Sequence, residues 1–287
     1  MTTATVDLDD LKRHIGTKHT TTDVLTAAPA NLLRLTFDRP EPEFKDGDVL
    51  PPGWHILYFL PRFRPNELRP DGAPASSGVV PAMPFPRRMF AGQTFRFHKP
   101  LRLGQALRQE IELTDISVKS GGTGALVFAT VVSRLYGPDG LALEDQRGTV
   151  FREEVKAGER NQAPRRDAVP ADVPWRRTIT PNPVLLFRFS ALTFNSHRIH
   201  YDHEWATKTE GYPALVVHGP LTSTLLADFA RDHAGGRPIK SIVTQARAPL
   251  FDGTPFELRG TPTDKGADLW AVTPEGTLAM SAQVELG

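Results

Sequence analysis

Reactive side chains are concentrated in one segment of the chain, residues 195–219. Asn195 begins this segment, and four histidines follow it: His197, His200, His203 and His218. Histidine is the side chain most often used where a proton must move near neutral pH. A short polar side chain such as Asn195, five residues before His200, could hold a water molecule that the imidazole activates. The segment therefore predicts acid–base chemistry on a bound water.

The end of the same segment predicts a site for negative charge. Gly219 and Pro220 open a run in which apolar residues recur three and four positions apart, and Gly235-Gly236 closes it, which predicts a helix. Because Pro220 has no N–H, the Gly219 amide is the natural free donor at the helix N-terminus, where the helix dipole favours an anion. Such an amide can polarise a thioester carbonyl and stabilise the enolate that forms during addition or elimination.

Plainer interpretations exist for several of these residues. Asp202 is interpreted as the N-cap of a short helix that ends near Gly211, rather than as a catalytic acid. His197 and His200, three residues apart, could instead ligate a metal with Asp202 as a third ligand. His218 is the other candidate third ligand, or it is merely packed beside the next glycine. A histidine cluster without a recognised ligand motif is weak evidence, so we predict no metal and no cofactor.

Two stretches lack the apolar spacing of a helix or a strand, and the second of them divides the chain. Residues 61–86 are too rich in proline for regular structure and too long for a simple turn. Residues 154–174 are charged and nearly devoid of large apolar side chains, which is typical of an interdomain linker. The linker predicts two parts, residues 1–153 and 175–287.

Each part contains a helix-like apolar segment followed by strand-like runs. In the first part the helical segment is residues 20–38, interrupted by Pro29, and in the second it is the helix that begins at Gly219. The strand-like runs are residues 93–99, 109–117, 125–136 and 148–152, then residues 239–246, 256–261, 268–273 and 278–286. One helix followed by antiparallel strands, twice, predicts an α+β fold in which each sheet wraps its own helix.

Composition excludes several classes of protein. Lysine plus arginine (34) nearly balances aspartate plus glutamate (33), so no nucleic-acid partner is predicted. The chain has no cysteine, which removes disulfides and thiolate chemistry. The first residues lack the apolar core of a secretory signal, and no apolar run reaches the ~18 residues of a membrane span. These features predict a cytoplasmic protein without a membrane partner.

The histidine segment, FSALTFNSHRIHYD followed by GYPALVVHGPL, resembles the MaoC-like hydratases and dehydratases. The resemblance is best to the double-hotdog members: the type 2 hydroxyacyl-thioester dehydratases and the mesaconyl-C4-CoA or itaconyl-CoA hydratases. Their motif usually reads G-D-x-N-P-[ILV]-H, so His200 matches the catalytic histidine and Asn195 stands where an aspartate is usual. An amide cannot accept a proton as a carboxylate does. The resemblance therefore implies that His200 is the main acid–base group, Asn195 orients water and Gly219 holds the thioester oxygen.

The first half resembles the amino-terminal hotdog of the same branch. The matching segments are residues 83–105, 117–131 and 143–153. In that branch the first hotdog lacks catalytic residues and helps to form the acyl pocket. The resemblance thus implies a double hotdog, with a non-catalytic half at residues 1–153, a linker at 154–174 and a catalytic half at 175–287. One chain would make a complete two-hotdog unit, so the protein would be a monomer or a homodimer.

The implied reaction is syn addition of water to a 2,3-enoyl-CoA, or its reverse. The favoured substrate is a C5 dicarboxylic thioester such as mesaconyl-C4-CoA or itaconyl-CoA, which would give citramalyl-CoA. A free carboxylate needs a cationic clamp, for which arginine is best suited. The candidate substrate-binding residues are Arg87, Arg88, Arg198, His218 and Arg247.

Three alternatives remain open at this stage. A 3-hydroxyacyl-ACP or -CoA dehydratase of fatty-acid metabolism would need a deep apolar tunnel and a basic docking face. A thioesterase on the same fold is disfavoured, because such enzymes commonly place a carboxylate near the helix where this chain has His218 and Gly219. A non-catalytic acyl-thioester binding module would bind without turnover, and its binding would survive the replacement of His200.

Overall fold

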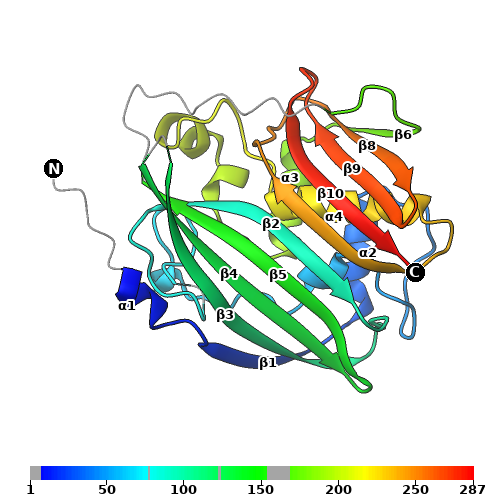
Figure 1. The fold of residues 1–287 in the computed structure, drawn as a ribbon, viewed down its shortest axis with the longest axis horizontal. Helices are drawn as coiled ribbons and strands as arrows, with labels where there is room; N and C mark the ends of the chain where they lie inside the picture. The colour runs from blue at the N-terminus through cyan, green and yellow to red at the C-terminus, as the bar shows by residue number, and fades with distance from the viewer. Residues whose placement is uncertain (1–7, 77, 122–123, 154–168) are drawn as a thin grey trace.

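The computed structural model describes residues 8–76, 78–121, 124–153 and 169–287. Ten strands within these residues form one sheet in the order β1-β3-β4-β5-β2-β7-β10-β9-β8-β6 (Figure 1). The strands of the first half are β1 (Lys18–Val24), β2 (Arg87–Phe97), β3 (Ala106–Gly121), β4 (Gly124–Gly137) and β5 (Gly140–Arg152). Those of the second half are β6 (Trp175–Ile179), β7 (Ile239–Ala246), β8 (Phe256–Thr263), β9 (Gly266–Val272) and β10 (Leu278–Leu286).

The strand order is symmetric about its centre. β1, β3, β4, β5 and β2 on one side correspond in position to β6, β8, β9, β10 and β7 on the other. The two sets meet where β2 pairs antiparallel with β7, with Thr94 opposite Val243. Because every neighbouring pair of strands is hydrogen-bonded, the sheet continues unbroken from one half of the chain into the other.

The three longest helices lie together on one side of the sheet (Figure 1). The helical elements are α1 (Leu8–Lys12), α2 (Ala27–Thr36), α3 (Pro183–Leu192) and α4 (Gly219–His233), with short turns η1 (Trp54–Leu57), η2 (Pro65–Glu67), η3 (Arg198–His200) and η4 (Trp205–Thr209). Helix α4 contacts β7, β9 and β10 and, across the seam, β2. Its residues 221–230 are all buried, so it forms the centre of the core. None of the helices in the described residues is long and apolar enough to cross a membrane.

A large apolar cluster extends through both halves. Trp54 and Phe95 come from the first half and Phe229 and Leu258 from the second, and all four side chains are at most 2% exposed. Full burial of a side chain of this size contributes about 1.5–3 kcal/mol. Because one cluster contains side chains of both halves, packing in the core holds the two halves in a fixed position relative to each other.

The helix predicted over residues 20–38 is wrong in its first part. Those residues divide into β1, which ends at Val24, and α2, which begins at Ala27. Pro29 lies in the first turn of α2, where a missing N–H breaks no hydrogen bond inside the helix. The β-branched run Thr20-Thr21-Thr22 favours the strand, and it pairs with β3.

The helices of the two halves are not all equivalent. In element order, α2 of the first half corresponds to α3 of the second, and both follow the edge strand of their half. Among the described residues of the first half, the element at the position of α4 is the four-residue turn η1. Phe59 follows it with a left-handed φ of 53°, and Pro61 restricts the residue before it, so the chain leaves helical geometry there.

The two irregular stretches have different outcomes. The described positions of residues 61–86 carry the short η2 and isolated bridge residues such as Leu68 and Pro74, and no long helix or strand, as the proline content predicts. The proposed linker at 154–174 falls largely outside the described residues, which resume at 169.

Candidate active site

The histidine segment follows α3 and is turned back on itself at one residue. Phe194 adopts a left-handed φ of 50°, and the next N–H, of Asn195, donates to the carbonyl oxygen of Ser190 at 2.8 Å. This turn directs the loop back across the end of α3. The short η3 then places His200 inside the protein, while Asn195 faces a large cleft.

A loop of the first half holds this segment in place. The Arg198 N–H donates to the carbonyl oxygen of Asp71 at 2.8 Å, and the Ser196 hydroxyl donates to the carbonyl oxygen of Gly72 at 2.6 Å. A Cβ on Gly72 would collide with the backbone of Ser196, so glycine is required for this approach. The proline-rich stretch therefore positions the histidine loop.

His200 is fixed by the backbone of Val216. Its Nδ1–H donates to the Val216 carbonyl oxygen at 2.7 Å, and the Val216 N–H donates to the Ile199 carbonyl oxygen at 2.9 Å. A carbonyl can only accept, so Nδ1 carries the proton and Nε2 of the neutral ring is free to act as a base. Burial, followed by the neighbouring His197, lowers the pKa of His200 to about 3, and the bond to Val216 opposes this shift.

His218 packs behind His200 and does not face the cleft. Its side chain is fully buried, its ring stacks on that of His200 with centroids 3.6 Å apart, and its Nε2 lies 2.8 Å from the Ser190 hydroxyl. Burial, and then the adjacent His200, lower the pKa of His218 well below the ordinary value. The sequence assigned this residue tentatively to substrate binding, whereas its placement suits the positioning of His200.

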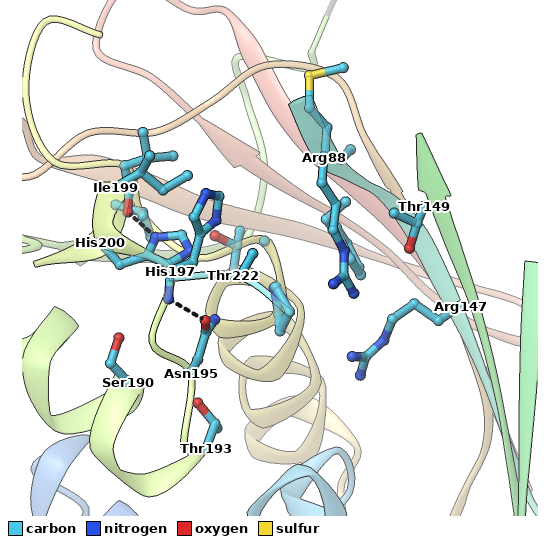
Figure 2. Close-up of a pocket in the computed structure, with 18 of the residues that line it drawn as sticks. Arg88, Arg147, Thr149, Ser190, Thr193, Asn195, His197, Ile199, His200 and Thr222 are labelled. Atoms are coloured by element: carbon cyan, nitrogen blue, oxygen red, sulfur yellow. Dashed lines mark hydrogen bonds between the residues drawn. The ribbon is translucent and has the colours of Figure 1, made fainter. Parts of the chain in front are cut away.

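Asn195 has one end of its amide fixed. Its Oδ1 accepts the backbone N–H of His197 at 3.1 Å, as the dashed line in Figure 2 shows. Because a backbone N–H can only donate, the amide oxygen must face it and the NH₂ group is left to donate elsewhere. Asn195 lines the cleft, so this NH₂ group can orient a water or a substrate hydroxyl there.

Gly219 is the first residue of α4, and it also lines the cleft. Its N–H has no intrahelical acceptor, because the first four amides of a helix lack one. A Cβ on Gly219 would lie 2.6 Å from Cδ1 of Phe90, a residue of β2 in the first half. Glycine thus lets the first half close directly over the helix N-terminus.

The cleft has a volume of about 2770 Å³, well above the ~300–1,000 Å³ typical of small-ligand pockets. It is lined from both halves of the chain. The predicted site residues that line it are Asn195, His200, Gly219, Arg87, Arg88 and Arg247. A cleft of this size can hold a ligand as large as an acyl-CoA.

The candidate arginines differ in what they already bind. Arg87 donates to the carbonyl oxygen of Glu210 at 2.9 Å and lies over the ring of Tyr212. Arg198 does not line the cleft: it donates to Asp202 at 2.7 Å and stacks on Trp205. Both guanidinium groups are therefore occupied within the protein.

Arg247 lies at the cleft surface, and Arg88 projects into the cleft. Arg247 is exposed and donates to Gln245 at 2.8 Å. Arg88 is exposed to the cleft, and loss of solvation within the cleft, followed by the charge of Arg147, lowers the pKa of Arg88. Sequence reasoning missed Arg147 altogether. Alternation along β5 was a usable signal, because Asp145 and Arg147 share a strand face and both line the cleft.

Asp202 has the structural role predicted for it. Its Oδ1 accepts the Trp205 N–H at 3.0 Å at the start of the helical turn that contains η4, and Gly211 beyond that turn has a φ of 72°. Among the residues that the structure describes, no group of three or more histidine, aspartate or glutamate side chains is arranged to hold a metal. Stacked rings such as those of His200 and His218 direct their nitrogens along parallel planes instead of toward a common point.

Solved structures of MaoC-like dehydratases share this fold. One from Phytophthora capsici superposes with a TM-score of 0.71 at 18% identity, covering 98% of this chain and 99% of that one. A second MaoC-like dehydratase gives a TM-score of 0.70 at 15% identity, covering 96% and 99%. These likenesses show that the chain has the MaoC-like hotdog fold, and the predicted double-hotdog fold is confirmed.

Sequence comparison identifies the family more closely. Residues 53–252 match the family model for hydroxyacyl-thioester dehydratase type 2. A mesaconyl-C(4)-CoA hydratase of Chloroflexus aurantiacus is 44% identical over 278 residues, which cover 95% of this chain and 96% of that protein. A mitochondrial hydroxyacyl-thioester dehydratase type 2 of Schizosaccharomyces pombe is 28% identical, with 73% and 78% covered. The chain belongs to the hydroxyacyl-thioester dehydratase type 2 family, whose members are hydro-lyases.

Proposed function

We propose that the chain adds water across the 2,3-double bond of an acyl-CoA thioester, with His200, Asn195 and Gly219 as its catalytic residues. One observation carries the proposal. The buried, neutral His200 is bonded through Nδ1 and leaves Nε2 free, in a loop that also presents the Asn195 amide to the cleft, where the α4 N-terminus lies too. A base, a water-orienting amide and an anion-stabilising donor are the groups that hydration requires.

The proposed reaction begins with the substrate and a water held in place. The Gly219 N–H holds the thioester oxygen, and the amide of Asn195 and Nε2 of His200 hold a water against carbon 3. The water oxygen bonds to carbon 3 while His200 takes one of its protons, and the electron pair of the double bond moves onto the thioester oxygen as an enolate. His200 then returns the proton to carbon 2. Because one imidazole gives and takes the proton, hydrogen and hydroxyl add to the same face.

The favoured substrate is mesaconyl-C4-CoA, hydrated to citramalyl-CoA. The 44% identity to the Chloroflexus aurantiacus hydratase of that name, over nearly the full length of both chains, supports this choice. Itaconyl-CoA is a related candidate. The 28% identity to the fission-yeast dehydratase supports the alternative of a 3-hydroxyacyl-thioester dehydratase. Residues of both halves of one chain line the cleft, which supports a monomer as the active unit, with a homodimer as the alternative.

A hydration assay tests the proposal. Purified protein is offered mesaconyl-C4-CoA, itaconyl-CoA and crotonyl-CoA, and the loss of enoyl-thioester absorbance is followed. His200→Ala is expected to lower kcat about 10²- to 10⁴-fold, the range for general acid–base catalysis. His203→Ala is the matched control, because His203 is exposed and outside the cleft lining.

The outcomes separate the candidate functions. Preference for crotonyl-CoA would keep the chemistry and discard the dicarboxylic substrate. Binding of thioesters without turnover, undiminished in His200→Ala, would identify a binding module. Full activity in His200→Ala would refute the mechanism.

A further inference from the structure

Two arginines project from the first half into the cleft beside the histidine loop. Arg88 lies on β2 and Arg147 on β5, and both line the cleft. Figure 2 shows their guanidinium groups pointing into the same space, opposite the loop that carries Asn195, His197 and His200. The Arg88 charge also contributes to the lowered pKa of His197, which places this guanidinium electrostatically close to the loop.

Arg88 and Arg147 form an arginine wall, and its positive charge is not balanced by neighbouring carboxylates. Arg147 has a carboxylate partner in Asp145, at 3.6 Å, yet its buried Nε has no hydrogen-bond partner. Among the described residues no side-chain hydrogen bond or ion pair is made by Arg88, and the acid whose charge acts on it, Asp71, is already 3.6 Å from Arg69. Two like charges in a partly enclosed space repel each other. The wall therefore holds a positive charge that an anionic ligand would neutralise.

The carboxylate beside Arg147 is itself firmly held. Asp145 is buried, accepts the Gln93 side-chain amide at 2.6 Å and lies 3.2 Å from Nε2 of His55. The Gln93 backbone N–H donates to the hydroxyl of Thr244 across the seam between the halves. Asp145 can thus keep Arg147 directed into the cleft, because its own position is fixed by two strands and by η1.

We propose that Arg88 and Arg147 together bind the free carboxylate of a dicarboxylic acyl-CoA, an inference that rests on the proposed function. In mesaconyl-C4-CoA this carboxylate is bonded to carbon 3 counted from the thioester, the carbon that receives the hydroxyl. The anion site must therefore lie within a few ångströms of the attacking water and near the plane of the double bond, whereas the water and the base approach one face of that plane. The guanidinium groups of Arg88 and Arg147 point into the cleft opposite the loop that carries Asn195 and His200 (Figure 2).

The pair has a role beyond affinity. A carboxylate on carbon 3 repels an approaching water oxygen and makes that carbon less electrophilic. Two guanidinium groups on the carboxylate offset its charge during the attack, and arginine is suited to this because it binds carboxylates through two parallel N–H bonds. Loss of either arginine should therefore change kcat as well as KM.

The test compares two substrates that differ only in the charged group. Mesaconyl-C4-CoA carries the carboxylate, and 3-methylcrotonyl-CoA carries a methyl group in its place. Arg88→Met and Arg147→Met are each expected to lower kcat/KM for mesaconyl-C4-CoA about 10- to 100-fold. Neither variant should lower it for 3-methylcrotonyl-CoA. Arg96→Met is the control, because Arg96 lies on β2 as Arg88 does but is exposed outside the cleft lining.

A binding measurement separates failure of this inference from failure of the proposed function. Titration calorimetry on the inactive His200→Ala protein gives the affinity for both thioesters without turnover. The preference for mesaconyl-C4-CoA should disappear when either arginine is replaced. If the unmodified protein hydrates no thioester, the proposed function fails and the calorimetry alone decides the inference. Equal losses for both thioesters, or no loss for either, would overturn the carboxylate site.

Discussion

Replacing Gly219 by alanine tests the role of the α4 N-terminus directly. The new Cβ would lie 2.6 Å from Cδ1 and 2.8 Å from Cβ of Phe90. Carbon atoms in ordinary contact are about 3.5 Å apart, so helix and ring must separate by about 0.9 Å (3.5 − 2.6). A shift of ~1 Å in a positioning group can reduce the rate ~100-fold, and overpacking of this kind costs about 1–3 kcal/mol of stability.

We expect kcat for hydration to fall about 100-fold in Gly219→Ala while KM changes little, because an oxyanion donor acts mainly in the transition state. Urea unfolding should show a loss of about 2 kcal/mol. Gly148→Ala is the matched control, since its Cβ would meet Cβ of Ala91 at an ordinary 3.5 Å. This control should keep both activity and stability.

A second substitution tests the physical cause. Phe90→Gly removes the ring and the Cβ that the new methyl group would strike, so the double variant should recover part of the lost kcat. If Gly219→Ala hydrates its substrate within twofold of the unmodified protein, the contact with Phe90 does not displace a donor on which the rate depends, and the reasoning from this contact is wrong. If Phe90→Gly gives no recovery, the loss does not arise from this contact.

The remaining predictions concern pH, Asn195 and one buried carboxylate. Since the pKa of His200 is lowered to about 3, kcat/KM should show no acid limb near pH 6.5, and a limb there in a pH–rate profile would contradict the assignment. His197, lowered to about 4, and His218 are likewise neutral in the folded state. The unfolded chain therefore binds more protons below about pH 6.5, and stability measured by urea unfolding should fall as pH drops from there toward 4. Asn195→Asp keeps the acceptor for the His197 N–H but adds a negative charge, so the acid limb should move up toward neutral pH. Asp228→Ala removes a fully buried carboxylate that lies 3.0 Å from Arg39 and should lower the free energy of unfolding by about 3 kcal/mol, whereas Glu204→Ala, in an exposed pair, should leave it unchanged.

The sequence was informative wherever local pattern decides structure. The glycine and proline that begin α4, the N-cap role of Asp202 and most strands follow from capping chemistry and alternation, and the structure has them. The division of residues 20–38 was missed, because a β-branched run and a helix-like run lie in succession with only a short connection between them. The short β6 and helix α3 were missed as well.

Tertiary contacts limited what the sequence could say about the site. The stacking of His218 behind His200, and the closure of Phe90 over Gly219, depend on residues far apart in the chain. No spacing rule ranks the arginines either. Arg87 and Arg88 are neighbours, yet one is occupied by Glu210 and the other faces the cleft without a partner among the described residues.

The two halves differ in their helices, and this difference bears on how one chain can carry both the proposed base, His200, and the proposed anion site at Arg88 and Arg147. The second half has the long α4, whose N-terminus meets the histidine loop, and the described residues of the first half have the short η1 at the corresponding position. The chain after η1 turns away at Phe59, and this residue and its successors Leu60 to Phe63 line the cleft instead of continuing a helix. A helix at that position would need the volume that these residues leave to the ligand. In the proposed mechanism the first half therefore supplies space, the loop at Asp71 and the two arginines, while the second half supplies the proposed reacting groups.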